Sequence, residues 1–428
     1  MIDMVGIGPF VMIPLVIRMV GSNLFLWAWI FGAFTALADG MIWSELGAAY
    51  PLAGGSYNFL KESYGEKGGR LMGFLFVWQT CLQAPLVVAS GAIGFAQYFD
   101  YLVPLGAIGK KAVSGTLVII VVLLLYRNIK TIGKISVFLW AGVIITILWI
   151  ILSGFTHRQV QYSFMPSGDQ SLFSFAFVLL LGQASVKTIY SYLGYYNVCH
   201  LGGEIKDPGR NIPRSIFISI FCIAILYLCM NLSIVNVVPW QQAMRSDFIV
   251  SLFMEKIYGH RTAMVATVLV LWIAFASLFA VVLGYSRVPY AAAVDGSFFP
   301  IFAQLHPRKN FPYISLLFIG ALGFIFSLSL RLDHAISAIL AMRILVQFVA
   351  QAVGVISLRR RKGTKDLPFR MWLYPLPVIL SVSIWLFVLF STGRVALFGL
   401  LLAGCGGIVY YFTRGLWKGQ PAGGGGVN

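Results

Sequence analysis

Twelve apolar runs, most of them long enough to cross a lipid bilayer, constrain the fold of this chain more than any other feature of its sequence. A membrane-spanning helix needs about 20 mostly apolar residues. The runs lie roughly at 1–20, 23–49, 69–99, 112–126, 133–155, 171–203, 212–236, 261–290, 312–330, 334–357, 371–392 and 395–413. They predict an all-α polytopic membrane protein with about twelve transmembrane helices.

The composition agrees with a membrane protein and excludes an ordinary soluble one. Hydrophobic residues make up 59% of the 428 residues and charged residues only 11%, and the mean hydropathy is +0.86. Soluble domains carry about 25% charged residues, which cover their surface. None of the five cysteines forms a CxxC pair, so a structural zinc site or a disulfide framework is not expected.

The net charge of +17 would suggest a nucleic-acid partner in a soluble protein, but here it has a different explanation. One alternating set of connections between the runs holds 20 of the 31 Lys and Arg residues, and the opposite set holds 8. Cytoplasmic connections of membrane proteins are enriched in these residues. We therefore expect no nucleic acid, a lipid bilayer as the surroundings, both termini in the cytoplasm, and a location in the plasma membrane.

Two of the runs are interrupted by helix-breaking residues. The first contains Gly6, Gly8 and Pro9, and the sixth contains Gly194. Gly and Pro are common in membrane helices, so one broken run alone would carry little weight. Irregular backbone within a bilayer is tolerated only where it lines a cavity or is buried in protein. Two broken runs therefore predict a cavity between them.

The breaks lie five spans apart, and this spacing predicts an inverted repeat. A unit of five helices that is repeated once must enter the membrane upside down the second time, with its broken helices in corresponding positions. We expect a first repeat at 1–156, a second, inverted repeat at 171–358, two further helices at 371–413, and a flexible tail at 419–428. The N-terminal ends of half-helices suit an anion and freed carbonyls suit a cation, so such a cavity suits a zwitterion.

Four motifs resemble those of the amino acid–polyamine–organocation superfamily, and they follow in that family's order over nearly the whole chain. They are "GIGPFV" at 6–11, "ELGAAYPLAGGSYNFLKESYG" at 45–65, "YLGYYNVCHLGGEIKDPGRNIPRSI" at 192–216 and "SRVPYAAAVDGSFFP" at 286–300. The resemblance implies a LeuT-type fold, with a 5+5 inverted repeat, broken helices 1 and 6, and two C-terminal helices. It also implies transport of amino acids or related amines by alternating access.

The resemblance also implies where the substrate binds. Backbone groups at Gly6, Ile7 and Gly8 would hold the substrate carboxylate. Carbonyls around Tyr190, Ser191 and Leu193 would hold its ammonium group, with Gly194 permitting the unwinding. Tyr190 takes the place of an aromatic gate in many members, and the weaker alternative is an aromatic residue of the membrane interface.

The coupling ion stays open between H⁺ and Na⁺, and no cofactor or metal is expected. Some proton-coupled members carry a lysine midway along helix five, whereas 137–151 contains no ionisable residue. Ser277 could contribute to a sodium site, but a lone serine is more often a packing residue. The segment 98–111 contains no cysteine, so a disulfide-linked partner subunit is not expected.

Three ionisable residues, Asp39, Lys187 and Arg343, fall within or at the ends of spans. Ionisable groups at that depth are costly and are candidates for function. Asp39 and Arg343 carry opposite charges and are hypothesised to neutralise each other or to share a polar cavity. Lys187 lies three residues before Tyr190 and either faces the cavity or extends to the interface.

The most consistent function is a secondary active transporter of amino acids, with an amino acid as its small-molecule partner. A polyamine would need several carboxylates in the cavity, and the spans offer almost none, so a neutral substrate is expected. An amino acid sensor without net transport and a polyamine or amine permease remain alternatives. No motif of a hydrolase or metalloprotease is present, so the chain is not expected to be an enzyme.

The start of the chain carries one further expectation. A half-helix from the membrane surface to the bilayer centre takes about ten residues. Only 1–5 precede Gly6. We therefore expect the inner half of helix one to be short, with Asp3 near the cytoplasmic mouth and the natural start lying upstream.

Overall fold

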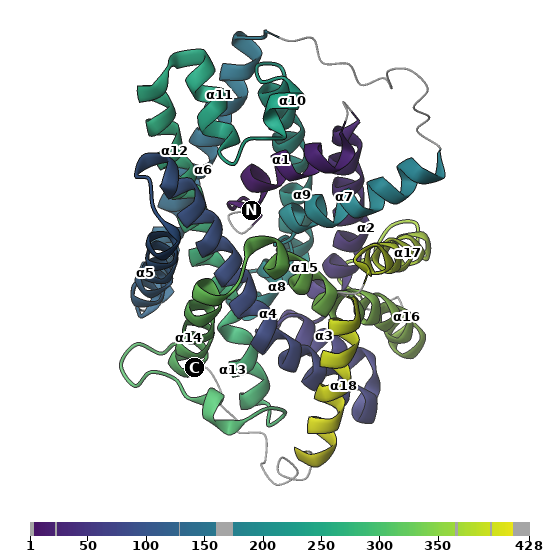
Figure 1. Ribbon diagram of the computed structural model, residues 1–428. Coiled ribbons are helices and arrows are strands. Elements are labelled where there is room, and N and C mark those ends of the chain that lie inside the picture. The colour runs from purple at the N-terminus through teal and green to yellow at the C-terminus, as the bar shows by residue number, and fades with distance from the viewer. Residues whose placement is uncertain are drawn as a thin grey trace.

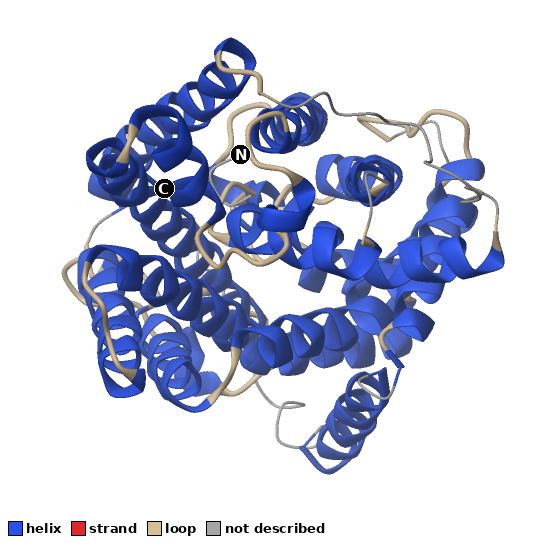
Figure 2. Ribbon diagram, turned by 45° about the horizontal axis from the view of Figure 1, so that its top comes forward, coloured by secondary structure: helices blue, strands red, loops and turns tan. Residues whose placement is uncertain are grey.

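The computed structural model describes residues 4–21, 24–127, 129–159, 174–363, 367–393 and 396–413. In these segments the chain forms helices and no β-strand (Figures 1 and 2). Asp3 and the predicted tail at 419–428 lie outside the described residues. The all-α fold class predicted from the apolar runs is confirmed.

The helices of the N-terminal half are α1 (Gly8–Val20), α2 (Phe25–Ala49), α3 (Ser56–Ser63), α4 (Gly65–Leu102), α5 (Ala107–Leu125), α6 (Ile129–Thr156), α7 (Phe175–Tyr192), α8 (Asn197–His200) and α9 (Pro208–Val235). The others are α10 (Trp240–Ala243), α11 (Ile249–Tyr258), α12 (His260–Tyr285), α13 (Arg287–Val294), α14 (Tyr313–Ser329), α15 (Leu332–Arg343), α16 (Ala350–Lys362), α17 (Leu376–Ser391) and α18 (Ala396–Thr413). A π-helical turn at Ile344–Val349 joins α15 to α16.

Every predicted apolar run coincides with one of these helices or with a pair of them. Among the described residues, seven helices are long and apolar enough to cross a membrane, and four shorter apolar helices accompany them. These helices support a multi-pass membrane protein. The number of crossings and the inverted arrangement of the two repeats stay predictions.

Both predicted breaks are present as irregular backbone. Residues 4–7 are not helical, and α1 begins only at Gly8 with a proline in its first turn. Residues 193–196 form turns between α7 and α8, and Gly194 has a φ of 116° there. This left-handed conformation favours glycine because it lacks a Cβ, which explains why the sixth span breaks at that residue.

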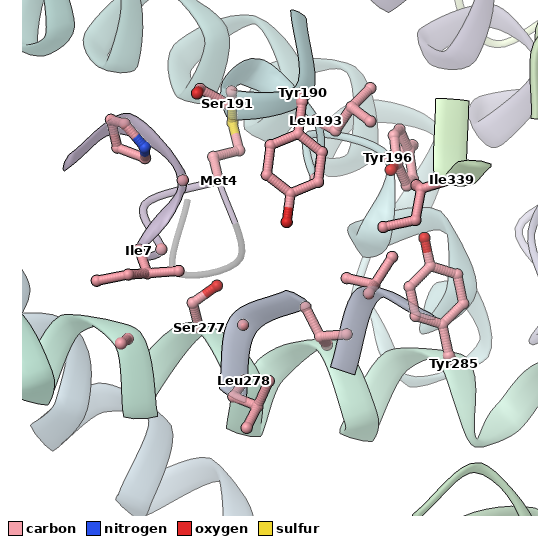
Figure 3. A pocket seen from close by; sticks show the side chains of 18 of the residues that line it. Met4, Ile7, Tyr190, Ser191, Leu193, Tyr196, Ser277, Leu278, Tyr285 and Ile339 are labelled. Carbon is pink, nitrogen blue, oxygen red and sulfur yellow. The ribbon is translucent and has the colours of Figure 1, made fainter. Parts of the chain in front are cut away.

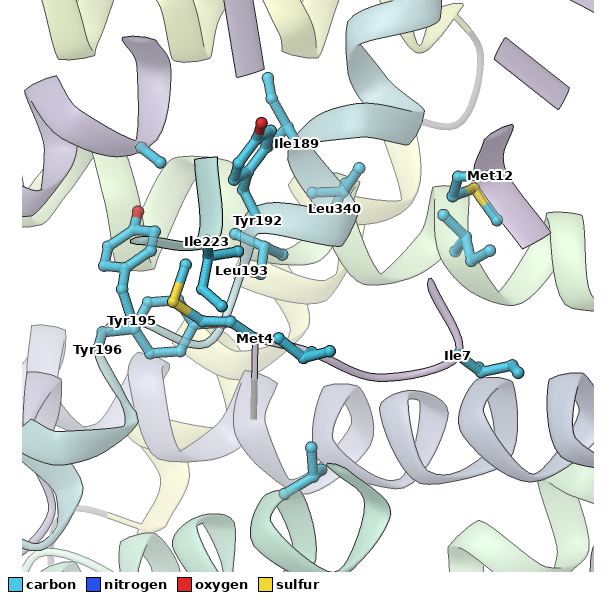
Figure 4. Packing of buried hydrophobic residues seen from close by; sticks show 14 of the residues in the cluster. Met4, Ile7, Met12, Ile189, Tyr192, Leu193, Tyr195, Tyr196, Ile223 and Leu340 are labelled. Carbon is cyan, nitrogen blue, oxygen red and sulfur yellow. The ribbon is translucent and has the colours of Figure 1, made fainter. Parts of the chain in front are cut away.

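Helix packing brings the two breaks together inside the bundle. Helix α1 packs against α7, while α2 packs against α7, α9 and α17. The long helix α4 packs against α12, α14 and α15. Met4 from the first break and Leu193, Tyr195 and Tyr196 from the second are all part of the buried apolar core (Figure 4).

The amphipathic stretch at 246–259 contains the short helix α11. Helix α11 packs against α12 and also contacts α1, and it lies close to α10 at one end of the molecule (Figure 1).

Candidate functional site

A cavity lies where the two helix breaks meet, and it has a free volume of about 60 Å³. One water molecule needs roughly 15 Å³ by this measure, so several waters or a small solute fit. Helix α12 and the middle of α4 supply the facing wall. The lining includes all seven residues that the sequence assigned to substrate binding, namely Gly6, Ile7, Gly8, Tyr190, Ser191, Leu193 and Gly194.

The two glycines of the first break leave room for close neighbours. A Cβ atom on Gly6 would lie 2.5 Å from Oγ of Ser277 on α12. A Cβ atom on Gly8 would lie 3.3 Å from Cε1 of Tyr190. The first glycine is therefore required for the packing of the break against α12, and the second leaves the start of α1 open beneath the tyrosine ring.

The start of α1 offers backbone donors to the cavity. The first N–H groups of a helix have no partner within the helix, and no side chain caps this one. Because Pro9 has no N–H, the donors at this end belong to Ile7, Gly8 and Phe10, of which Ile7 and Gly8 line the cavity. Together with the partial positive charge of a helix N-terminus, they suit a carboxylate.

The second break presents the opposite end of a helix. Helix α7 ends at Tyr192, so its last carbonyl groups carry the partial negative charge of a helix C-terminus. Oη of Tyr227 on α9 donates to the carbonyl oxygen of Met4 at 2.6 Å and lies 3.3 Å from that of Ser191. Tyr227 thus bridges the backbone of the first break and the end of α7, which borders the second break.

Tyr190 reaches across the cavity. Its side chain points into the cavity, and Ser277 faces it from the wall formed by α12 (Figure 3). Its hydroxyl oxygen lies 2.8 Å from Oγ of Ser90 on α4, within hydrogen-bond distance. The ring is held by its backbone on α7 at one end and by the contact with Ser90 at the other, so it can cover a molecule bound in the cavity. Its role as a gate stays a prediction.

We expect Tyr190→Ala to lower amino acid uptake at least tenfold with little change in the amount of folded protein, because the variant loses the ring that covers Gly8. Tyr190→Phe keeps the ring and loses only the hydroxyl contact. One hydrogen bond contributes about 0.5–1.5 kcal/mol, so Tyr190→Phe should lower amino acid uptake roughly two- to tenfold. Uptake kinetics measured beside surface expression test this expectation.

Ser90→Ala is the matched control, because it removes the same hydrogen bond from the other side. Its effect should equal that of Tyr190→Phe. Wild-type kinetics in Tyr190→Ala would contradict a gating role and place the residue outside the substrate path.

Asp39 lies on α2 and does not line the cavity. It is 1% exposed and accepts hydrogen bonds from four side chains. The donors are Trp43 at 2.8 Å, Tyr195 at 2.5 Å, Ser381 at 3.0 Å and Trp385 at 3.2 Å. Asp39 therefore ties the second break to α2 and α17 as a positioning residue.

Arg343 ends α15 and does line the cavity. Its Nε donates to Oε1 of Gln347 at 2.8 Å, and its guanidinium lies 4.7 Å from the centre of the Tyr196 ring. The hypothesis of an Asp39–Arg343 ion pair is wrong for this conformation, because the carboxylate is occupied by Trp, Tyr and Ser donors and the guanidinium lies over aromatic rings. The adjacent Tyr195 and Tyr196 separate the two charges.

Lys187 lies on α7, half-buried, and is not among the residues that line the cavity. Sequence reasoning missed three tyrosine or serine side chains at the site, namely Ser90, Tyr227 and Tyr285. All three are hydroxyl-bearing residues within predicted apolar runs, a signal that they share with many other residues of those runs. Ser277, considered for a sodium site, lines the cavity beside Gly6.

Comparison with known proteins gives a match to one protein family over nearly the whole chain. A family model described as amino acid permease matches residues 1–403. The chain is 24% identical over 430 residues to the branched-chain amino acid permease BcaP of Bacillus subtilis, across 95% of this chain and 89% of the relative.

Two further relatives come from a bacterium and from an animal. The serine/threonine exchanger SteT of Bacillus subtilis is 26% identical over 396 residues, across 91% of this chain and 87% of the relative. The human large neutral amino acids transporter small subunit 2 is 25% identical over 431 residues, across 98% of this chain and 79% of the relative.

Proposed function

Because the chain belongs to the amino acid permease family, we propose that it is a secondary transporter that moves amino acids across a membrane by alternating access. The cavity between the helix breaks would be the substrate site. The α-carboxylate would bind the N–H groups at the start of α1, and the ammonium group would bind carbonyls at the end of α7.

The observation that carries this proposal is the meeting of two opposite helix ends at one cavity. The uncapped N-terminus of α1 and the C-terminus of α7 both border it. The first suits a negative group and the second a positive group. An amino acid is the smallest common metabolite class that carries both groups on one carbon atom.

The same lining argues against a polyamine or other polycation. Among the described residues, no carboxylate lines the cavity and an arginine does. A cationic ligand would meet Arg343 without a compensating acid, and like charges in a low-dielectric site repel strongly. A sensor that binds an amino acid without carrying it would have the same cavity, so only a flux measurement separates it from a transporter.

The arrangement in the membrane is part of the proposal. We place α1–α6 in one five-span repeat, the helices from α7 to α16 in a second, inverted repeat, and α17 and α18 outside both. The asymmetry of Lys and Arg supports cytoplasmic termini, and the location that we propose is the plasma membrane. In this arrangement the breaks lie at corresponding positions of the two repeats.

The test uses the purified chain in proteoliposomes with labelled amino acids. We expect time-dependent uptake above that of empty liposomes, and thermal stabilisation of the same preparation by the transported compounds. Imposed Na⁺ and H⁺ gradients, applied separately, would identify the coupling ion. Stabilisation without uptake under any gradient or with preloaded substrate would establish a sensor, and stabilisation by spermidine alone would establish a polyamine permease.

A further inference from the structure

Arg343 is the one charged side chain among the described residues that line the cavity. It is 1% exposed, and its Nη2 atom has no hydrogen-bond partner. A guanidinium carries five N–H donors and remains protonated in proteins. The cavity therefore contains a fixed positive charge with at least one unused donor nitrogen.

No acidic side chain of the described part of the chain neutralises this charge. The carboxylate of Asp39 is occupied by four donors, none of which is Arg343. The other fully buried acid, Glu45, forms an ion pair with Arg359. An unpaired charge at this depth is costly and marks a functional site by default.

Aromatic rings stabilise the cation only in part. The guanidinium lies 4.7 Å from the ring centre of Tyr196, 5.9 Å from that of Tyr285 and 5.5 Å from that of Phe348. Such cation–π contacts hold the guanidinium in place. They leave Nη2 without a hydrogen-bond partner, and a carboxylate is the group whose geometry best matches a guanidinium donor.

We propose that the ligand supplies the missing anion, and that the substrates of this cavity are amino acids with a carboxylate in the side chain. The inference rests on the proposed transport function and deepens it. Arg343 is the specificity-determining residue, and the side-chain carboxylate binds at its Nη2 atom.

The position of the tyrosines supports this assignment. Tyr196 and Tyr285, which hold the guanidinium, lie on the side of the cavity opposite Ile7 of the first break (Figure 3). An amino acid bound by its α-carboxylate at Gly8 would extend its side chain across the cavity toward them. The expectation of a neutral substrate rested on the scarcity of acidic residues in the spans, which disfavours polycations and places no limit on anions.

The test compares amino acids of nearly equal size that differ in charge. Glutamate is compared with glutamine, and aspartate with asparagine, by thermal stabilisation and by uptake into proteoliposomes. Charge-assisted hydrogen bonds are about twice as strong as neutral ones. We expect the acids to bind and to be transported at least tenfold better than their amides. Equal or better handling of the amides overturns the inference.

Substitution of Arg343 assigns the preference to this residue. Arg343→Gln should abolish the preference for glutamate over glutamine, and Arg343→Lys should retain part of it because the charge remains. An unchanged preference in folded Arg343→Gln overturns the assignment. If that variant does not fold, the comparison of acid with amide on the wild-type chain still decides the substrate class.

Two other outcomes distinguish competing explanations. Replacement of chloride by gluconate should leave glutamate affinity unchanged. If it instead weakens binding of neutral amino acids, the anion at Arg343 is inorganic and the inference fails while the transport function stands. If no amino acid of any charge is bound or taken up, the proposed function itself fails.

Discussion

Gly8→Leu should abolish amino acid binding and uptake while leaving the protein folded. A Cβ atom at this position already lies 3.3 Å from the ring of Tyr190 and 3.6 Å from Oγ of Ser191. The remaining leucine carbons would enter a cavity whose free volume is about 60 Å³. The α-carboxylate of the substrate could then no longer reach the N–H groups of α1. Each charge-assisted hydrogen bond lost in this way lowers the binding free energy by about 1.5–3 kcal/mol. Two such bonds correspond to a loss of affinity of a hundredfold or more.

The matched control is Gly404→Leu on α18. An added Cβ meets nothing within 4 Å there, and the residue is exposed. This variant carries the same change in side chain and should retain wild-type uptake. Both variants should elute as monodisperse protein in size-exclusion chromatography. Wild-type affinity in folded Gly8→Leu would contradict a carboxylate site at the first break.

The breaks could be predicted from the sequence because their causes are local. Glycine and proline weaken a helix through their own backbone, and Gly6, Gly8, Pro9 and Gly194 are visible in the sequence alone. Such residues do not end every helix, since Pro14 stays inside α1 and Pro85 inside α4. The spacing of five spans then placed the two breaks at one cavity, which is where the structure has them. Their role in substrate binding stays a prediction.

The contacts that complete the site could not be predicted, because they join residues far apart in the chain. Tyr190 and Ser90 are 100 positions apart, and Tyr227 and Met4 are 223 positions apart. A hydroxyl within an apolar run indicates a buried polar group and says nothing about which partner it meets. Such pairs depend on the packing of α4, α7 and α9 around the breaks.

The pairing of charges was predicted wrongly for a related reason. Opposite charges at similar depth suggested that Asp39 and Arg343 neutralise each other, but neutral donors can satisfy a carboxylate as well. Trp43 and Trp385 each donate an indole N–H to Asp39, although tryptophans in an apolar run look like packing residues. The π-helical turn directly after Arg343 was also unexpected, and such turns occur often at functional sites.

A different buried acid, Glu45, forms the ion pair whose loss should affect stability most. It lies at the end of α2 and is fully buried, and its partner Arg359 lies on α16. Nε and Nη2 of the arginine donate to the two carboxylate oxygens at 2.6 and 2.5 Å. The carboxylate also accepts the backbone N–H of Met371 at 2.7 Å. The pair thus joins α2, α16 and the chain that leads into α17.

Arg359→Met should destabilise the protein by about 3–5 kcal/mol, because it leaves the carboxylate of Glu45 buried without its partner. For a chain of this size we expect the apparent melting temperature in detergent to fall by at least about 5 °C. The double variant Glu45→Leu/Arg359→Met removes both charges and should recover part of the loss, since an apolar pair avoids the uncompensated charge. The recovery should be incomplete, because Met371 then loses its acceptor.

The control is an ion pair of the same type at the surface. Arg70 and Glu66 form a pair on α4 at 3.2 Å, with side chains 55% and 84% exposed. Exposed pairs of this kind contribute only about 0.3–0.5 kcal/mol, so Arg70→Met should leave the melting temperature nearly unchanged. If Arg359→Met is no more harmful than Arg70→Met, the buried pair does not hold α2 and α16 together. If the double variant loses as much stability as Arg359→Met and Glu45→Leu do in sum when each is made alone, the two charges do not stabilise each other.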